Sequence, residues 1–390
     1  MPAAKILILM IRHETIHLFY DILYRNLHRI ATWKFPKNFT FPIVKVLHSC
    51  YNYFNYVENG GSIPLCTAIC LHSDTHYFGR NLDLEYGYNE TVTITPRNYP
   101  FDFKHTESAA SHYAMIGMAT VIDGYPLYYE ATNEHGLSIA GLNFPKLAHY
   151  NKPTPGKLNV AVFEFVPWLL SQCKNMDDVN VLIPKLNLVD TPFSADFPPT
   201  PLHWIIADKD QCLVLESTAE GLKSYDNPIG VLTNAPEFPY HMTHLKDYQN
   251  ISPLPPENRF SASADMTPYS GAMGAVGLPG DWSSASRFVR AAFVRCNTPT
   301  LPTPVENINH FFRILQSVAM PMGSIQLKPG LHDLTRYSSC CDTNAGKYYY
   351  TTYANSRITC VDMHAEDLDS EDVIRYSLNN IPDILIQTQR

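Results

Sequence analysis

The sequence lacks any apolar run long enough to cross a membrane, and it lacks an excess of positive charge. Its 390 residues include 29 Lys and Arg against 37 Asp and Glu, which gives a formal net charge of −8. A transmembrane helix needs roughly 20 consecutive apolar residues. Nucleic acid or an anionic membrane needs a basic face on the protein that binds it. The composition therefore argues against both as main partners and is that of an ordinary globular protein, with 45% hydrophobic residues.

A secretory signal, a phosphate-binding loop and internal repeats are also missing. The apolar run Ile6–Ile11 has six residues before Arg12 interrupts it, whereas a signal peptide needs about 7–15. The glycine-rich stretch 271–280 has neither the Lys nor the Ser or Thr of a P-loop. We interpret that stretch as a tight loop that shapes a pocket rather than as a nucleotide site.

The cysteines do not form a disulfide framework. There are nine, an odd number scattered along the chain, which favours reduced thiols and a cytoplasmic protein. Cys66, Cys70, His72 and His76 invite a zinc interpretation, but the single residue between Cys70 and His72 is too short for the usual ligand spacing. We expect no metal site there. The adjacent pair Cys340-Cys341 is predicted to alternate on a strand rather than to form a vicinal disulfide.

Charge divides the chain into two unequal parts. Residues 1–65 hold seven bases and three acids, a net charge of +4, whereas 66–390 hold 22 bases and 34 acids, a net charge of −12. The first part also has 11 aromatic residues and only two glycines. It is a different kind of sequence from the rest, and we predict that it is a leader separate from a domain at 66–390.

From Cys66 onward, short β-prone runs alternate with turn residues, and helical periodicity is confined to two blocks. The first block is 160–187, where Pro167 is expected to divide the helix. The second is 283–318, with Ser283 or Ser284 as a cap and a second helix over 304–318. The order of elements predicts an α+β protein with antiparallel sheets. The predicted strands are 66–72, 76–81, 91–97, 113–122, 126–132, 136–142, 202–208, 211–218, 228–233, 334–341, 346–353 and 356–363.

The run from Cys66 to Asp83 is predicted to form a hairpin that combines a thiol, a guanidinium and a carboxylate. A cation such as Arg80 beside a thiol favours the thiolate, and a carboxylate such as Asp83 can hold a protonated amine. Spacing alone favours a core cysteine beside a structural Arg–Asp pair. The local signature of papain-like cysteine proteases is missing.

From Cys66 onward, the chain resembles the choloylglycine hydrolases, the family of bile salt hydrolases and penicillin V acylases. The resemblance runs in order from Cys66 to about residue 375. It is carried by Cys66-Thr-Ala-Ile, Phe78-Gly-Arg-Asn-Leu-Asp83, Pro96-Arg-Asn98, Asn133-Glu-His-Gly-Leu137, Ala140-Gly-Leu-Asn-Phe144, Pro201-Leu-His-Trp204, Gly230-Val-Leu-Thr-Asn-Ala-Pro236, Ser286-Arg-Phe288 and Tyr337-Ser-Ser-Cys-Cys341.

The resemblance implies an N-terminal-nucleophile hydrolase, an αββα sandwich of two antiparallel sheets in one domain over 66–390. This replaces the two or three domains that the length alone suggests. The family's nucleophile is an N-terminal cysteine that uses its own α-amine as base, and it matches Cys66. The other matching catalytic positions are Arg80, Asp83, Asn143, Asn234 and Arg287. Taken singly, Asn143 and Asn234 fit turn or cap residues, Arg287 fits a surface ion-pair partner, and Asp83 fits a turn residue.

The implied reaction is cofactor-free hydrolysis of the amide bond in glycine- or taurine-conjugated bile acids. Penicillin V or another N-acyl amide is the alternative substrate, and a catalytically silent lipid-binding relative is a third reading. Asn143 favours bile salts, because penicillin V acylases of the Gram-positive type tend to carry Tyr there. The acyl pocket is expected at Leu82, Ile122, Phe193 and Phe197, and the family suggests a homotetramer.

If Cys66 must have a free α-amine, residues 1–65 cannot remain attached to it in the active enzyme. They are either a propeptide cut before Cys66 or a segment encoded upstream of the true start. Leu65 stands where an initiator Met is expected, since the Leu codons TTG and CTG can start translation in bacteria. Gly60-Gly61 codons lie where a ribosome-binding sequence is expected. We hypothesise that the start lies at position 65, and other codons at 60, 61 and 65 would remove the argument.

Overall fold

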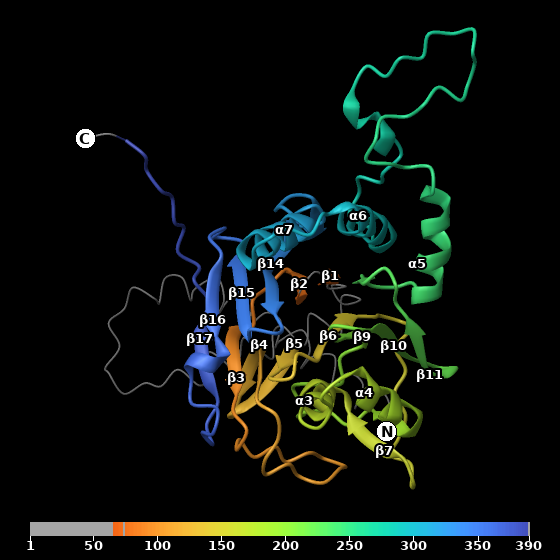
Figure 1. The fold of residues 1–390 in the computed structure, drawn as a ribbon. Helices are drawn as coiled ribbons and strands as arrows, with labels where there is room; N and C mark the ends of the chain where they lie inside the picture. The colour runs from red at the N-terminus through yellow and green to blue at the C-terminus, as the bar shows by residue number, and fades with distance from the viewer. Residues whose placement is uncertain (1–64, 73–74, 389–390) are drawn as a thin grey trace, which may run out of the picture. The chain divides into compact units, whose positions relative to one another are not determined.

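Two antiparallel sheets face each other in this computed structural model, which describes residues 65–72 and 75–388 (Figure 1). The described residues fall in one compact unit, Gly61–Arg390. The first sheet has the order β12-β1-β2-β14-β15-β16, with β13 also paired to β14. Its strands are β1 Leu65–His72, β2 His76–Leu84, β12 Val231–Leu232, β13 Ile325–Lys328, β14 Leu331–Asp342, β15 Lys347–Thr352 and β16 Thr359–Asp362.

The second sheet has eight strands in the order β11-β10-β9-β6-β5-β4-β3-β17. Apart from these, a parallel pair joins β7 Leu158–Ala161 to β8 Leu186–Val189. The strands of the second sheet are β3 Thr91–Thr95, β4 Met115–Ile122, β5 Tyr125–Asn133, β6 Ser138–Asn143, β9 Leu202–Ala207, β10 Cys212–Thr218, β11 Gly221–Asp226 and β17 Ile374–Ser377.

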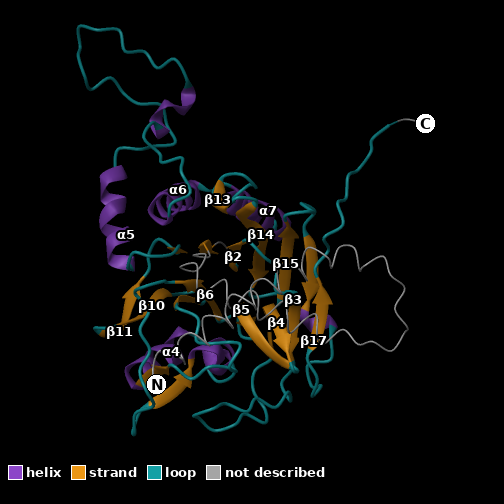
Figure 2. Ribbon diagram, turned by 180° about the vertical axis from the view of Figure 1, so that it is seen from behind, coloured by secondary structure: helices purple, strands orange, loops and turns teal. Residues whose placement is uncertain are grey.

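Helices cover the outer faces of both sheets (Figure 2). The first sheet is covered by α6 Ser284–Asn297 and α7 Pro304–Gln316, and the second by α3 Phe165–Leu170 and α4 Met176–Leu182. One apolar cluster fills the space between the sheets and under α6 and α7, and another lies between the second sheet and α3 and α4. The αββα sandwich predicted for this α+β chain is therefore confirmed.

All twelve predicted strands overlap observed ones. The second helical block is confirmed as well: Ser283 caps α6, and Thr303 with Glu306 forms a capping box on α7. Cys340 and Cys341 are adjacent free thiols on β14, as expected.

The prediction of a helix over 160–187 is wrong in part, because its two ends are the strands β7 and β8. Pro167 does not divide the helix either, since it lies at the third position of α3, where the backbone N–H has no intrahelical partner to lose. The short helix α5, Phe238–His244, was not predicted. No helix in the described part of the chain is both long enough and apolar enough to traverse a bilayer.

Candidate active site

The β1–β2 hairpin sorts the predicted residues onto two faces of the first sheet. Cys66 lies directly opposite Leu82, and Arg80 is two residues away on the same strand as Leu82, so the three side chains share one face. Arg80 donates to the carbonyl of Gly141 on β6 at 2.6 Å, so this face looks toward the second sheet. Asp83 takes the other face, which α6 and α7 cover. The hairpin therefore holds the thiol and the carboxylate on opposite sides of the strand pair.

Cys66 is held through its backbone and buried through its thiol, with 2% of the residue exposed. Its amide N–H donates to Asn234 Oδ1 at 2.9 Å, and its carbonyl accepts from Arg287. Burial raises the pKa of the thiol, while the charges of Arg80 and Arg287 and a hydrogen bond from the Asn143 backbone act against that rise. The surroundings thus supply cations and a donor to a thiolate that burial alone would disfavour.

Arg287 ties Cys66 to Asn234. This buried side chain projects from α6 and donates to Asn234 Oδ1 at 2.7 Å and to Thr67 Oγ1 at 2.7 Å. Its Nε donates to the carbonyl of Trp282 at 3.0 Å, which fixes the plane of the guanidinium. The first turn of α6 therefore sets the position of the Asn234 side chain beside β1.

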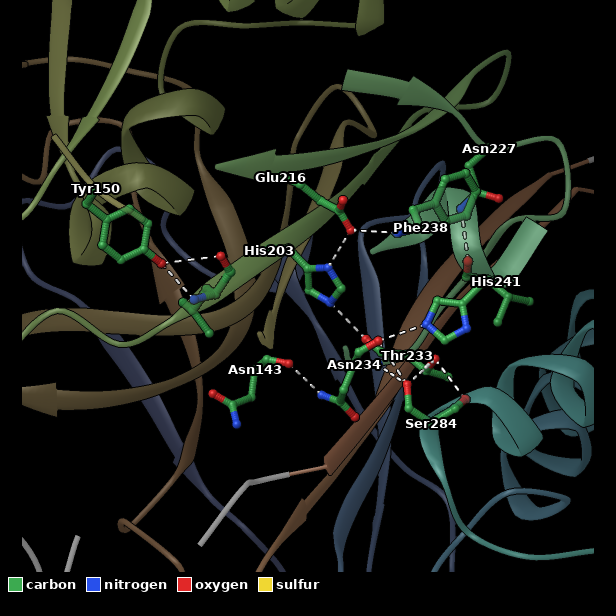
Figure 3. A network of polar contacts seen from close by, with 12 residues as sticks. Asn143, Tyr150, His203, Glu216, Asn227, Thr233, Asn234, Phe238, His241 and Ser284 are labelled. Carbon is green, nitrogen blue, oxygen red and sulfur yellow. Dashed lines mark hydrogen bonds and ion pairs between the residues drawn. The ribbon is translucent and has the colours of Figure 1, made fainter. Parts of the chain in front are cut away.

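Two asparagines meet next to the thiol. Asn234 follows β12, and its Nδ2 donates to the Asn143 carbonyl at 2.8 Å, which brings the end of β6 against the end of β12 (Figure 3). The backbone of Asn143 hydrogen-bonds the Cys66 thiol, and Oδ1 of the same Asn234 amide accepts from the Cys66 backbone N–H. Two neutral donors beside a thiol are the arrangement that stabilises an oxyanion during acyl transfer.

Arg80 is supported by a carboxylate that the sequence motifs did not single out. Glu130 on β5 lies 3.9 Å from Arg80 Nε, and both side chains are buried. The carboxylate also accepts from Tyr337 at 2.8 Å, from Ser339 at 3.0 Å and from Tyr348 at 2.5 Å. Glu130 thus links the two sheets and holds the guanidinium under β1.

Asp83 lies in a cluster with a second buried aspartate. Thr335 on β14 donates to Asp83 Oδ1 at 2.6 Å, whereas Oδ2 is buried and makes no hydrogen bond among the described residues. Burial raises the pKa of Asp83 to about 6, with Arg287 and Arg80 opposing the rise. Asp333 is also buried without a side-chain partner, and burial together with the charge of Asp83 raises its pKa to about 7. The two carboxyl groups leave buried oxygen atoms available to a cation.

In the chain that retains residues 1–65, Asp333→Asn should raise the free energy of unfolding more above pH 7 than at pH 4. A raised carboxyl pKa means that the folded state binds the proton more tightly than the unfolded state does. The stability that Asp333 contributes is full below about pH 4 and is lost as the pH rises toward about 7. Urea unfolding at several pH values should show the stability difference growing by on the order of 2–4 kcal/mol across that window. The matched control is Asp226→Asn, at an exposed position on β11. This variant should keep the wild-type pH dependence of the free energy of unfolding. The same pH dependence in both variants would contradict the raised pKa of Asp333.

The predicted pocket residues lie in two places. Leu82 is opposite Cys66 on β2. Ile122 ends β4 opposite Tyr125, and the ring of Tyr125 is 5.6 Å from that of Phe193. Phe193 also contacts Phe197 at 6.1 Å between ring centroids. Ile122, Phe193 and Phe197 therefore gather around the β4–β5 hairpin, whereas Leu82 lies beside the thiol.

The six predicted catalytic positions come together around Cys66 through the contacts above, although they lie on five segments of the chain, since Arg80 and Asp83 share β2. Motif reasoning missed the residues that hold them. A polar residue inside an otherwise apolar strand was the available signal, as in Tyr125–Asn133, Leu202–Ala207 and Cys212–Thr218. The missed residues are Thr67, Glu130, His203, Glu216, His241, Asp333 and Thr335, and Ser284 was expected only as a candidate helix cap.

Comparison with known proteins agrees with this sandwich, which is the fold of N-terminal-nucleophile hydrolases. The family described as "Linear amide C-N hydrolases, choloylglycine hydrolase family" matches residues 66–376. The chain belongs to this family and is a linear amide C–N hydrolase. The matched region begins at Cys66 itself.

Relatives are matched over nearly their whole length. The chain is 49% identical over 316 residues to the bile salt hydrolase/transferase of Lactiplantibacillus plantarum, covering 81% of this chain and 98% of that protein. It is 38% identical over 317 residues to the conjugated bile acid hydrolase of Lactobacillus gasseri, covering 80% of this chain and 100% of the relative.

Solved structures show the same fold. A mutant conjugated bile acid hydrolase from Clostridium perfringens superposes with a TM-score of 0.77 at 37% identity, covering 83% of this chain and 100% of that one. Penicillin V acylase from Agrobacterium tumefaciens superposes with a TM-score of 0.63 at 18% identity, covering 81% and 92% of the two chains, and shares the fold.

Proposed function

We propose that this protein hydrolyses the amide bond of glycine- or taurine-conjugated bile acids, with Cys66 as the nucleophile. The observation that carries the proposal is the match over 98% of the length of a bile salt hydrolase/transferase at 49% identity. The arrangement around Cys66 supports it, because two guanidinium groups and the Asn143 backbone act on the thiol and the Asn234 side chain binds the Cys66 backbone.

The reaction follows from the geometry of the site. The thiolate attacks the amide carbonyl, and the negative charge that develops on oxygen is stabilised by Asn234 Nδ2 and the Asn143 backbone N–H. The amine takes up a proton and departs, and the acyl group remains on Cys66 as a thioester. Water then attacks the thioester, and the carboxylic acid is released. Arg80 and Arg287 favour the thiolate. No cofactor is needed at any step.

The base in this reaction is proposed to be the α-amine of Cys66. A free α-amine has a pKa of about 7.7–8.0 and a thiol one of about 8.5, so the two are well matched for proton transfer. Asp83 Oδ2 is buried and free of hydrogen bonds among the described residues, and it would hold the α-ammonium. We therefore propose that residues 1–65 are not attached in the active enzyme.

Parallel assays on glycocholate, taurocholate and penicillin V test the substrate assignment. We expect release of glycine or taurine to exceed release of the penicillin side chain, because the relatives matched over nearly their whole length at 38–49% identity are bile salt and bile acid hydrolases. Penicillin V as the preferred substrate would overturn the bile acid assignment but leave the nucleophile unaffected. Bile acid binding without turnover would instead indicate a lipid-binding relative.

We further propose that the protein is a homotetramer, from the family resemblance, and that it is cytoplasmic, from its odd number of scattered cysteines. Light scattering coupled to gel filtration measures the mass of the assembly, and cell fractionation locates the protein. A monomer at micromolar concentration would contradict the first, and secretion into the medium the second.

Asn234→Ala should lower kcat/KM on the best substrate by about 10²–10³-fold, because one donor to the oxyanion is lost. Asn234→Asp keeps both acceptor contacts of Oδ1 but removes the donor, so it should be equally impaired. Asn227→Ala is the matched control: Asn227 is buried in the same segment and bonds the backbone of Val231 and Gly230, away from the thiol. An Asn234→Asp enzyme as active as Asn227→Ala would refute the oxyanion role.

A further inference from the structure

A buried histidine lies between the two proposed oxyanion donors. His203 on β9 pairs in register with Leu142 on β6, and its ring stacks on Phe144 with centroids 4.3 Å apart and planes at 8°. Its Nε2 is 2.9 Å from the Thr233 carbonyl (Figure 3). Asn143 precedes Phe144 and Asn234 follows Thr233. One imidazole therefore contacts the chain neighbour of each donor.

The hydrogen bonds of His203 define its protons. A carbonyl only accepts, so Nε2 must carry a hydrogen toward Thr233. Nδ1 is 3.1 Å from Glu216 Oε1, an oxygen that also accepts from the Phe238 N–H at 2.9 Å. That contact needs a second proton, on Nδ1 or on the carboxyl group. The pair therefore holds two protons with no net charge, which suits a site where both side chains are completely buried.

The Glu216 side of the network returns to Asn234. Phe238 begins α5, and His241 on the same helix donates from Nε2 to the Asn234 carbonyl at 2.9 Å. Burial lowers the pKa of His241 to about 4, so its ring is neutral and has one hydrogen to donate. Ser284, at the start of α6, also donates to this carbonyl at 2.8 Å. Asn234 is thus fixed from both β9 and the helices.

We propose that His203, together with Glu216, is a positioning residue that sets the separation of the Asn143 and Asn234 donors. This inference rests on the proposed function, since it assumes that these donors bind an oxyanion. His203 acts through Thr233 and Phe144 and does not touch the substrate. If the donors are displaced, they lose contact with the transition state, whereas substrate binding is unaffected. A variant should therefore lower kcat and leave KM unchanged.

His203→Phe preserves a flat ring but removes both hydrogen bonds. We expect kcat to fall by on the order of 10- to 100-fold, as for a donor misplaced by about 1 Å, with KM changed by less than about 3-fold. Glu216→Leu should lower kcat in the same way. Glu216→Gln should recover part of the loss, because its amide can donate to Nδ1 while its oxygen accepts from Phe238.

The matched control is His112→Phe. His112 is also a buried histidine with two carbonyl partners, Tyr113 at 2.8 Å and Tyr99 at 2.9 Å, and its ring contacts that of Phe101 at a tilt of 45°. Its loss should lower the thermal midpoint without lowering kcat, because none of these partners adjoins the donors. Thermal unfolding and steady-state kinetics on the preferred substrate should be measured for all four variants.

Three outcomes overturn the inference. The first is that His203→Phe, or Glu216→Leu if the former does not fold, keeps the wild-type kcat. The second is that the control loses as much kcat as the His203 variant, which would indicate a general effect of destabilisation. The third is that Glu216→Gln is no better than Glu216→Leu. If the wild type itself cleaves no amide substrate, the proposed function fails first and this inference falls with it. An active wild type with insensitive variants refutes only the positioning role.

Discussion

Cys66→Ala should abolish amide hydrolysis, with a loss on the order of 10⁴-fold or more, while the protein stays folded. The charges of the buried Arg80 and Arg287 and a hydrogen bond from the Asn143 backbone act on the thiol, and no second cysteine among the described residues has this set of partners. The change removes one buried sulfur atom from a strand whose backbone hydrogen bonds are unaffected. Product release on glycocholate and thermal unfolding should be measured on the same preparation.

Cys70→Ala is the control for this experiment. Cys70 lies four residues further along β1, on the same face and equally buried, but its backbone contacts are to Gly230 and Arg295 rather than to the asparagine pair. We expect this variant to keep its turnover within a few-fold. Intact mass after rapid quenching should show an acyl adduct on the wild type and on Cys70→Ala but not on Cys66→Ala. Full activity in Cys66→Ala would refute the nucleophile.

Local pattern predicted the fold where the signal is local. The β-prone runs 66–72 and 76–81, and the Ser283 cap of α6, depend on residues that are neighbours in sequence. The block 160–187 failed because a short parallel strand pair, β7 and β8, flanks its helices. Buried parallel strands are apolar throughout, so over a few residues they cannot be distinguished from buried helix by periodicity.

The site was predictable only as far as the family motifs reached. Cys66, Arg80 and Asp83 share one hairpin, and register alone places them on its two faces. Glu130 reaches Arg80 from the facing sheet, and Asp333 reaches Asp83 along β14. A buried polar residue in a strand reveals that it needs a partner, but only the packing of the two sheets determines which one.

The chain that retains residues 1–65 should have no turnover, whereas a chain beginning at Cys66 should be fully active. In the described structure Leu65 continues β1 opposite Asp83, and the nitrogen of Cys66 is an amide that donates to Asn234 Oδ1. An amide nitrogen has no basic lone pair, so it cannot accept the thiol proton. The expected difference is therefore as large as that of Cys66→Ala.

Intact mass and N-terminal sequencing of the active species measure this directly. Two preparations should be compared: protein expressed from the whole gene, and protein expressed with Met directly before Cys66. In both, only the molecules that begin at Cys66 should be active. A gene that carries Cys66→Ala distinguishes removal of a propeptide from a translation start at position 65. If a propeptide is removed by the thiol, this variant keeps residues 1–65; if translation starts at position 65, it loses them all the same. Full activity in a species that carries the mass of residues 1–65 would refute the α-amine as base, because Asp83 would then have no ammonium to hold.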